Sequence, residues 1–199
     1  TNGSLIVSSS SKVEGVAEFS GGSDNVGKIT FESTASGTKT CPFVANDIIM
    51  CQRVKVNESV APGEAVGNSS VVAKKVYLVG SVSQNVVTTA DASFTNDTAP
   101  VIGDEFVRLG NTSDANRQGV IYITSDDDNA PFIDIKSGVN SYSNWAIAPK
   151  VRLGRLDGIT NTDAGLDGTQ SSYYGLYSNN VHLTGHIHSG SGEIGGWTL

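Results

Sequence analysis

Two histidines placed two residues apart are the clearest candidates for chemistry in this chain. In a β-strand, residues two apart point to the same side, so His186 and His188 would share one face. If three copies met at an axis, six imidazoles would converge on a site that suits octahedral Fe²⁺. Alternatively, the opposite face points to the core and the histidines face solvent. That opposite face is apolar and consists of Val181, Leu183, Gly185 and Ile187.

Carboxylates are the second group that could carry chemistry. Glycoside hydrolysis needs two of them about 5–10 Å apart in a cleft. The pairs Asp157-Gly158 and Asp167-Gly168 are instead typical of turns. No helix-forming segment follows the glycine-rich stretch 190–196, so we expect no phosphate site there. The candidates are Glu105, Asp134, Asp157, Asp163, Asp167 and Glu193, and we predict that the chain is not an enzyme.

Loop aromatics offer a third possibility, namely binding of carbohydrate. Tyrosine and tryptophan present flat apolar rings with a polar edge, which suits stacking on sugars. The alternative is ordinary packing in a core or between chains. The candidates for contact with a glycan are Tyr142, Trp145, Tyr173 and Tyr174.

Composition limits the kinds of partner. Of the 199 residues, 38% are hydrophobic and 17% are charged, and 23 are glycine, which favours short strands joined by tight turns. The net charge of −7 comes with no basic stripe, so nucleic acid is not an expected partner. No apolar stretch approaches the roughly 18 residues of a membrane helix, so we expect no membrane insertion. Cys41 and Cys51 could form a disulfide or remain buried thiols.

The elements that would position these residues are strands. Apolar residues alternate with polar ones, and turn residues recur every 8–12 positions. This pattern predicts a small antiparallel barrel or sandwich over residues 41–103, preceded by an N-terminal β segment over 1–40 that could belong to a shaft. The expected strands are Val13–Phe19, Gly27–Glu32, Asn46–Val56, Val71–Val82 and Val86–Phe94.

Residues 104–199 have a different texture. The sequence Val-Arg-Leu-Gly occurs at 107–110 and again at 151–154, each time before a polar loop and a further strand pattern. Towards the C-terminus, single apolar residues stand between glycines, which lets three backbones approach one axis. We therefore predict a repeated, elongated β module that intertwines in a trimer. Its predicted interchain core consists of Val107, Leu109, Val151, Leu153, Ile194 and Trp197.

The residues from about 40 to 199 also carry a family resemblance. Residues 103–111 (GDEFVRLGN), 117–124 (RQGVIYIT), 151–159 (VRLGRLDGI), 174–181 (YGLYSNNV) and 191–197 (SGEIGGW) occur in that order. In this the chain resembles tail fibre and tail-associated structural proteins of Bacteroidetes phages and prophages. The resemblance implies a virion tail protein, often trimeric, with a role in host attachment and no catalytic residues. The His-x-His pair is similar to iron sites in the long tail fibre tips of some contractile-tailed phages.

Together these observations predict an all-β homotrimer that forms a rigid shaft or adaptor in a bacteriophage tail fibre. Its expected partners are copies of itself, other virion tail proteins and a host surface glycan. One alternative is a receptor-binding module that grips a host surface polysaccharide. Another is a bacterial surface adhesin that works as a monomer.

Overall fold

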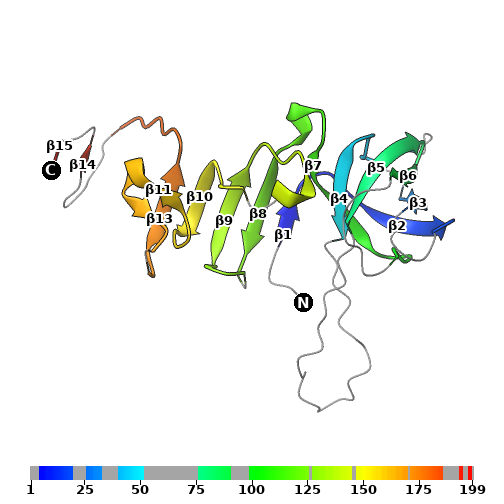
Figure 1. Cartoon of the computed structure of the whole chain (residues 1–199), viewed down its shortest axis with the longest axis horizontal. Helices are drawn as coiled ribbons and strands as arrows, with labels where there is room; N and C mark the ends of the chain where they lie inside the picture. Colours follow the sequence, from blue (N-terminus) through cyan, green and yellow to red (C-terminus); the bar gives the residue numbers. More distant parts are fainter. Residues whose placement is uncertain are drawn as a thin grey trace, which may run out of the picture.

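The computed structural model contains two β units side by side, a closed barrel and an open five-stranded sheet (Figure 1). Apart from strands and loops, it has three short 3₁₀ helices, so the predicted all-β class is confirmed for the residues that the structure describes. The structure describes residues 5–19, 26–32, 40–51, 76–90, 99–125, 127–144, 147–169, 171–185, 193–194 and 197–198.

The barrel confirms the predicted small antiparallel β unit. Each strand pairs antiparallel with both neighbours, and the last strand pairs with the first, so the barrel leaves no open edge. Its strands, in order around the barrel, are β2 (Ser10–Ala17), β3 (Lys28–Phe31), β6 (Val86–Ala90), β5 (Val76–Ser83), β4 (Asp47–Cys51) and β7 (Glu105–Asn111).

Aromatic side chains fill the barrel. The Phe31 ring meets Phe43 and Phe106 edge-on, with ring centroids 4.9 and 5.9 Å apart, and Tyr77 packs against Phe106 at 5.8 Å. All four are fully buried. Phe31, Tyr77 and Phe106 point inward from their strands, and Phe43 reaches the same cluster from the segment before β4. Cys41 lies at the margin of this cluster, and burial raises the pKa of its thiol. It forms no disulfide with Cys51.

The open sheet lies beside the barrel. Its strands run across the long axis of the molecule and are stacked along that axis (Figure 1). In spatial order they are β1 (Leu5–Val7), β8 (Val120–Thr124), β9 (Phe132–Lys136), β10 (Val151–Arg155) and β13 (Tyr174–Ser178). The shorter elements are η1 (Ala115–Arg117), η2 (Tyr142–Asn144), η3 (Thr162–Ala164) and the pairs β11 (Thr160–Asn161) with β12 (Leu166–Asp167) and β14 (Glu193–Ile194) with β15 (Trp197–Thr198).

The predicted domain boundaries need correction. Residues 1–40 are not a separate segment, because β1 belongs to the open sheet while β2 and β3 complete the barrel. The barrel also extends past residue 103, since β7 closes it against β2. The barrel strands therefore lie between β1 and β8 in the chain, although β1 and β8 pair with each other, Leu5 opposite Ile123.

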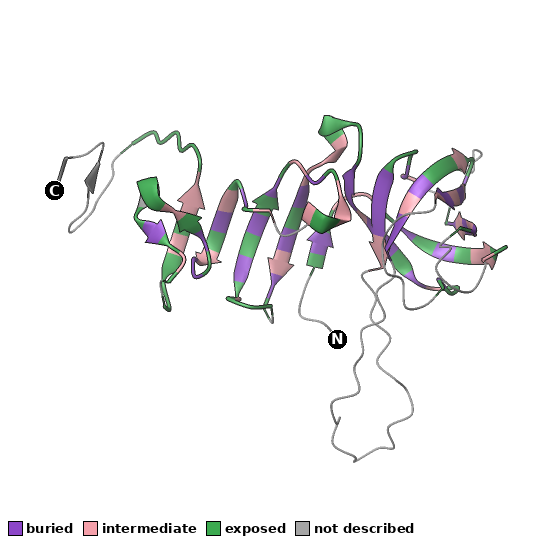
Figure 2. Cartoon of the chain, in the orientation of Figure 1, coloured by how far each residue is buried: buried purple, intermediate pink, exposed green. Residues whose placement is uncertain are grey.

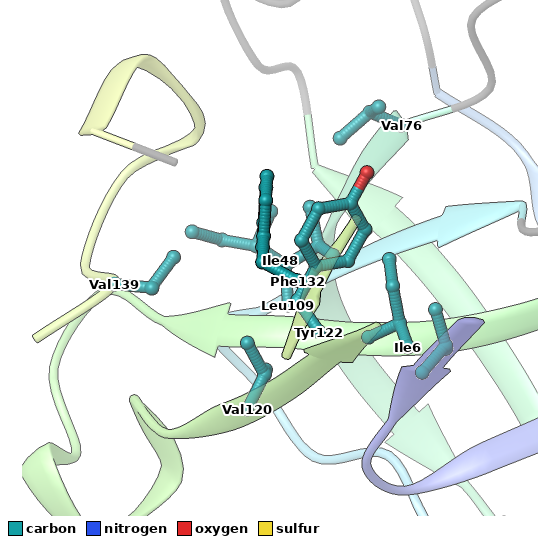
Figure 3. Close-up of a cluster of buried hydrophobic side chains, with 9 residues drawn as sticks. Ile6, Ile48, Val76, Leu109, Val120, Tyr122, Phe132 and Val139 are labelled. Carbon is teal, nitrogen blue, oxygen red and sulfur yellow. The ribbon is translucent and has the colours of Figure 1, made fainter. Parts of the chain in front are cut away.

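One apolar cluster connects the two units. It combines barrel residues such as Ile48, Val107 and Leu109 with sheet residues such as Tyr122 and Phe132 (Figure 3). Its other buried members are Ile6, Val76, Val120 and Val139. Because both units bury side chains in the same cluster, neither could separate from the other without exposing it to water.

An ion pair reinforces this junction. Asp47, at the start of β4, is fully buried and accepts two hydrogen bonds from Arg117 of η1. Arg117 Nε donates to Oδ1 at 2.9 Å, and a terminal guanidinium nitrogen donates to Oδ2 at 2.6 Å. It also accepts a hydrogen bond from Asn111 Nδ2 at 2.9 Å. The hydrogen bonds from Arg117 to Asp47, together with the negative charge of Asp47, raise the pKa of Arg117. The pair ties the barrel to the connection that leads into the sheet.

The two Val-Arg-Leu-Gly segments do not occupy equivalent places, so the predicted repeat of the β unit needs correction. The first lies in β7 of the barrel, where Val107 and Leu109 are fully buried. The second lies in β10 of the open sheet, where Arg152 is buried and Leu153 is exposed. The same four residues thus present opposite faces to their surroundings.

Candidate functional site

The inner face of the open sheet contains a buried ion pair. Asp134 on β9 and Arg152 on β10 are direct cross-strand partners. Arg152 donates from Nε to Oδ1 at 2.6 Å and from its terminal nitrogen to Oδ2 at 2.7 Å. Its guanidinium also lies over the Phe132 ring, 3.7 Å from the centroid. This bidentate geometry satisfies both charges in a buried place.

Polar groups continue along this inner face. Lys136 is buried beside the pair, with its amine 5.7 Å from the centroid of the Tyr122 ring. Desolvation lowers the pKa of this amine, although the charge of Asp134 opposes the shift. The inner face of β8, β9 and β10 is therefore a mixed layer of rings and paired charges.

The outer face shows the opposite character. Along β9, Asp134 is fully buried, whereas its neighbours Ile133 and Ile135 are 37% and 43% exposed. Along β10, Arg152 is buried and Leu153 is 55% exposed. The usual alternation of strands, with apolar residues inside and polar residues outside, is inverted here. Figure 2 shows alternating buried and exposed bands on these strands.

The strand registers align these outward residues into two rows that run across all five strands. The first row consists of Leu5, Ile123, Ile133, Leu153 and Leu176. The second consists of Val7, Ile121, Ile135, Val151 and Ser178. The nine aliphatic side chains of these rows are called the aliphatic face below. Neither row contains a charged residue.

The aliphatic face is large for a surface in contact with water. Seven of its nine side chains are large hydrophobics with high exposure: Leu5, Val7, Ile121, Ile133, Ile135, Leu153 and Leu176. Their exposed parts amount to on the order of 600 Å², the upper end of the patch sizes found on monomeric proteins. The largest patch of this kind on a monomeric protein is often functional, so the aliphatic face is a candidate contact surface.

The predicted interchain core divides into three groups. Val107 and Leu109 need correction, because they are buried in the cluster that joins barrel and sheet and cannot reach another chain. Val151 and Leu153 lie on the aliphatic face, so their interchain role stays a prediction. Ile194 and Trp197 pair in the β14–β15 hairpin, but their side chains lie outside the described part of the structure.

The predicted glycan contacts do not form one cluster. Tyr142 in η2 packs against the apolar cluster that connects barrel and sheet, which is called the joint core below. Tyr173 and Tyr174 instead lie at β13, the far edge of the sheet (Figure 1). These two are 60% and 62% exposed. Trp145 lies outside the described residues. Among the candidates that the structure describes, the well-exposed aromatic side chains are therefore the tyrosines at the start of β13.

A buried carboxylate positions this tyrosine segment. Asp157 accepts hydrogen bonds from the Ser172 N–H at 3.0 Å and the Tyr173 N–H at 3.1 Å, and it pairs with Arg155. Burial opposes ionisation of Asp157, but these hydrogen bonds outweigh it, so the pKa of the carboxyl is lowered. The carboxylate thus holds the chain at its entry into β13.

The remaining candidates for chemistry fall into three groups, because some are engaged, some are exposed and some are not described. Glu105 and Asp163 are exposed, and the side chain of Glu193 lies outside the described part of the structure. Asp134 and Asp157 form ion pairs, and Asp167 accepts hydrogen bonds from Thr169 in a turn. His186 and His188 lie outside the described residues. Within the described part, no group of three or more His, Cys, Asp or Glu side chains could hold a metal ion. The predicted iron site is therefore neither placed nor tested.

Comparisons with protein-family models, curated proteins and solved structures found nothing that matches the chain. The resemblance to phage tail fibre proteins therefore stays a prediction. Among the described residues, no helix has both the length and the hydropathy needed to cross a membrane.

Sequence reasoning found only part of the aliphatic face. It singled out Val151 and Leu153, but not Ile133 and Ile135, although the alternation Phe-Ile-Asp-Ile-Lys over 132–136 was visible. Because Asp134 and Lys136 are charged, that alternation would ordinarily place the isoleucines inside. An available signal was the arginine of the second Val-Arg-Leu-Gly segment, which could neutralise a buried aspartate.

Proposed function

We propose that this chain is a structural, non-enzymatic segment of a bacteriophage tail fibre, and that it works as a homotrimer forming a rigid shaft or adaptor that supports host attachment. Its working partners would be copies of itself and neighbouring tail proteins. The order of motifs between residues 103 and 197, which resembles that of tail fibre proteins, supports this proposal.

The observation that carries the proposal is the joint core between barrel and sheet. A shaft must transmit force without bending between its units. Ile48, Leu109 and Tyr122 belong to one cluster that spans the junction, and the ion pair of Asp47 with Arg117 lies alongside it. The barrel and the sheet can therefore act as one rigid body rather than as two domains joined by a flexible linker.

The aliphatic face gives independent support for self-association. A protein that acts as a monomeric adhesin would keep this nine-residue surface in water, at a cost of roughly 25 cal/mol for each Å². In a fibre, the same surface would be covered by partner chains. The adhesin alternative is therefore less well supported than the fibre.

A receptor-binding module is the second candidate. Tyr173 and Tyr174 are exposed at the sheet edge, and the Asp157 carboxylate fixes the backbone before them. This arrangement could present a ring to a sugar. The two tyrosines are adjacent in sequence, however, so an extended backbone directs their side chains to opposite faces and they do not form one platform.

The mass and shape of the purified chain in solution test the proposal. We expect light scattering to give three times the chain mass of 20.7 kDa, and X-ray scattering to give an elongated particle. A monomer at all accessible concentrations would contradict the fibre and favour the adhesin. Elemental analysis of the same sample would show whether iron accompanies the trimer.

A glycan array with the same preparation separates shaft from receptor binder. We expect no specific binding if the segment is only a shaft. Specific binding that is lost in the Tyr173→Ala/Tyr174→Ala variant, with the oligomer preserved, would instead establish the receptor-binding role. Release of reducing sugar from a capsular polysaccharide would contradict the non-enzymatic assignment.

A further inference from the structure

We infer that the aliphatic face of the open sheet is the surface through which copies of this chain bind one another, packed around an axis parallel to the stacking direction of its strands. The inference rests on the proposed trimer and deepens it by naming the contact surface. The contact involves Ile133 and Leu153 at its centre, not the buried Val107 and Leu109.

The inverted alternation is the first argument. A sheet with one dry face would place its isoleucines inside and its charges outside. This sheet buries Asp134 with Arg152 and turns Ile133, Ile135 and Leu153 outward. Burying an ion pair requires loss of hydration from both groups. The outward aliphatic residues are accounted for when that face is also removed from water, so that the sheet is buried on both sides.

The composition of the face indicates a copy of the same chain rather than an unrelated protein. Interfaces that form transiently are about as apolar as the rest of a protein surface, whereas permanent homo-oligomer interfaces resemble a core cut in half. The two rows hold nine aliphatic residues and one serine, without a charge. Charge therefore offers nothing for recognising a foreign partner.

The area of the face is also adequate for a stable contact. A standard interface buries about 800 Å² on each partner. The aliphatic side chains alone supply on the order of 600 Å² on each copy, before the rims are counted. Around a threefold axis each copy meets two others, so the whole face can be buried.

The shape of the face favours three copies. The backbones of the two rows are only about 7 Å apart, while the first and last of the five stacked strands are roughly 19 Å apart along the long axis of the molecule, so the face is a narrow stripe. Two such stripes placed face to face would leave both long sides open to water. Three stripes close around an axis, with six aliphatic side chains in each of four layers and three in the β13 layer, where Ser178 takes the second position.

A pair of matched substitutions tests the contact. Leu153→Glu places a carboxylate at the centre of the aliphatic face, where the native side chain is 55% exposed in a single chain. Ile102→Glu makes the same kind of change at a side chain that is 69% exposed. Ile102 lies in the connection from β6 to β7, outside both rows. Each variant would be examined by light scattering, with circular dichroism as a check of the fold.

We expect the unsubstituted chain and the Ile102→Glu variant to have three times the mass of one chain, and Leu153→Glu to run as a folded monomer. A trimer that survives Leu153→Glu would overturn this contact surface while leaving the proposed trimer intact. A dimer that only Leu153→Glu dissociates would support the contact and contradict the trimeric shaft. A monomeric unsubstituted chain would overturn both.

A second measurement does not depend on the Leu153→Glu variant folding. In Leu153→Cys and Ile102→Cys variants of the assembled protein, a maleimide reagent reports access to the new thiol, with the unsubstituted chain giving the background from Cys41 and Cys51. We expect the thiol at position 153 to react at least about tenfold more slowly than the thiol at 102. Equal rates would overturn the contact. Slow reaction at 153 in a monomer would also overturn it, because another part of the same chain would then cover the face.

Discussion

At the scale of single residues, the pair of Asp134 and Arg152 determines which way the sheet faces. Its two hydrogen bonds of 2.6 and 2.7 Å, together with the stack of Arg152 on Phe132, satisfy both charges within the inner layer. Once these two residues are inside, the period of two along each strand sends Ile133 and Leu153 outward. On β9 and β10 the outward residues of the aliphatic face therefore follow from the burial of this ion pair.

Removing one partner of this pair should lower the free energy of unfolding strongly, whereas replacing both partners with apolar residues should lower it little. We expect Arg152→Met to destabilise the fold by about 3–5 kcal/mol, because it leaves the Asp134 carboxylate buried without a partner. The double variant Asp134→Leu/Arg152→Met should recover most of that loss. Urea denaturation of the two single variants and the double variant would measure the coupling. Additive losses in the double variant would contradict a buried, mutually dependent pair.

The carboxylate of Asp157 gives a prediction for pH. Its pKa is lowered in the folded chain from the ordinary value of 3.8, so it stabilises the fold above that pH and loses this contribution as the pH falls through its folded pKa. We expect Asp157→Asn to lower the Tm at pH 5–7, and the gap from the unsubstituted chain to narrow below about pH 4. Thermal melts between pH 3 and 7 would show this.

The matched control for this experiment is Asp163→Asn, because Asp163 is an exposed carboxylate in η3. We expect that variant to follow the unsubstituted chain across the same pH range. A gap between Asp157→Asn and the unsubstituted chain that stays constant or widens towards low pH would show that the hydrogen bonds to Ser172 and Tyr173 do not depend on the charge.

Sequence patterns identify residues well where each side chain follows the usual rule. Ile29 and Phe31 alternate with the polar residues Lys28, Thr30 and Glu32 and are buried, as strand periodicity predicts. The same rule fails at Asp134, because its partner Arg152 is 18 positions away and nothing local indicates the pairing. The histidine pair was predicted from spacing alone, and its site stays untested.

At the scale of elements, both glycines of the Val-Arg-Leu-Gly strands are required because another backbone segment passes close to them. A Cβ at Gly110 would lie 2.0 Å from the Val139 carbonyl oxygen, and a Cβ at Gly154 would lie 2.6 Å from that of Pro131. In each strand the backbone of another segment passes too closely for any side chain. The repeated motif thus reflects two similar close approaches, although the strands face opposite ways.

We therefore expect Gly110→Ala to destabilise the fold strongly, because the clash is with backbone and cannot be relieved by rotating a side chain. The affected contact includes the hydrogen bond from the Asn111 N–H to the Val139 carbonyl, 3.1 Å long. Gly138→Ala is a useful contrast. A Cβ at Gly138 meets nothing within 4 Å, although its φ of +92° adds strain. Thermal melts should show a larger loss for Gly110→Ala, and equal losses would contradict this account.

Strand positions were predictable where the pattern was long. The expected strands at 13–19, 27–32 and 86–94 overlap β2, β3 and β6. By contrast, β1 has only three residues and becomes a strand through pairing with β8, a contact between residues more than a hundred positions apart. Residues 181–184 alternate like a strand but adopt no regular structure. Local periodicity cannot predict pairing that depends on distant partners.

At the scale of the whole molecule, the joint core makes the barrel and the sheet one cooperative unit. We expect a single calorimetric transition at a fixed protein concentration. We expect Leu109→Ala to lower the free energy of unfolding by about 3 kcal/mol, because the cavity that it creates lies between the two units. Ile102→Ala, at an exposed site, should leave the transition in place. Two separate transitions would show that the units unfold independently.

The order of units along the chain could not be read from composition. The change of texture near Pro100 suggested a boundary, yet β7 after it still belongs to the barrel. Closure of a barrel needs its first and last strands to pair, and Ser10 lies opposite Val107. A boundary drawn where turn residues accumulate misses such long-range closure.

The passage of the chain between its two units has a mechanical consequence. The chain leaves β1 of the sheet for β2 of the barrel within two residues, and it returns from β7 to β8 past η1. Because β1 pairs with β8 and β2 pairs with β7, the two connections join paired strands of the sheet to paired strands of the barrel. A single connection would allow the barrel to rotate relative to the sheet, whereas two connections resist that rotation. Torque applied at one end of the molecule would then turn the other end with it.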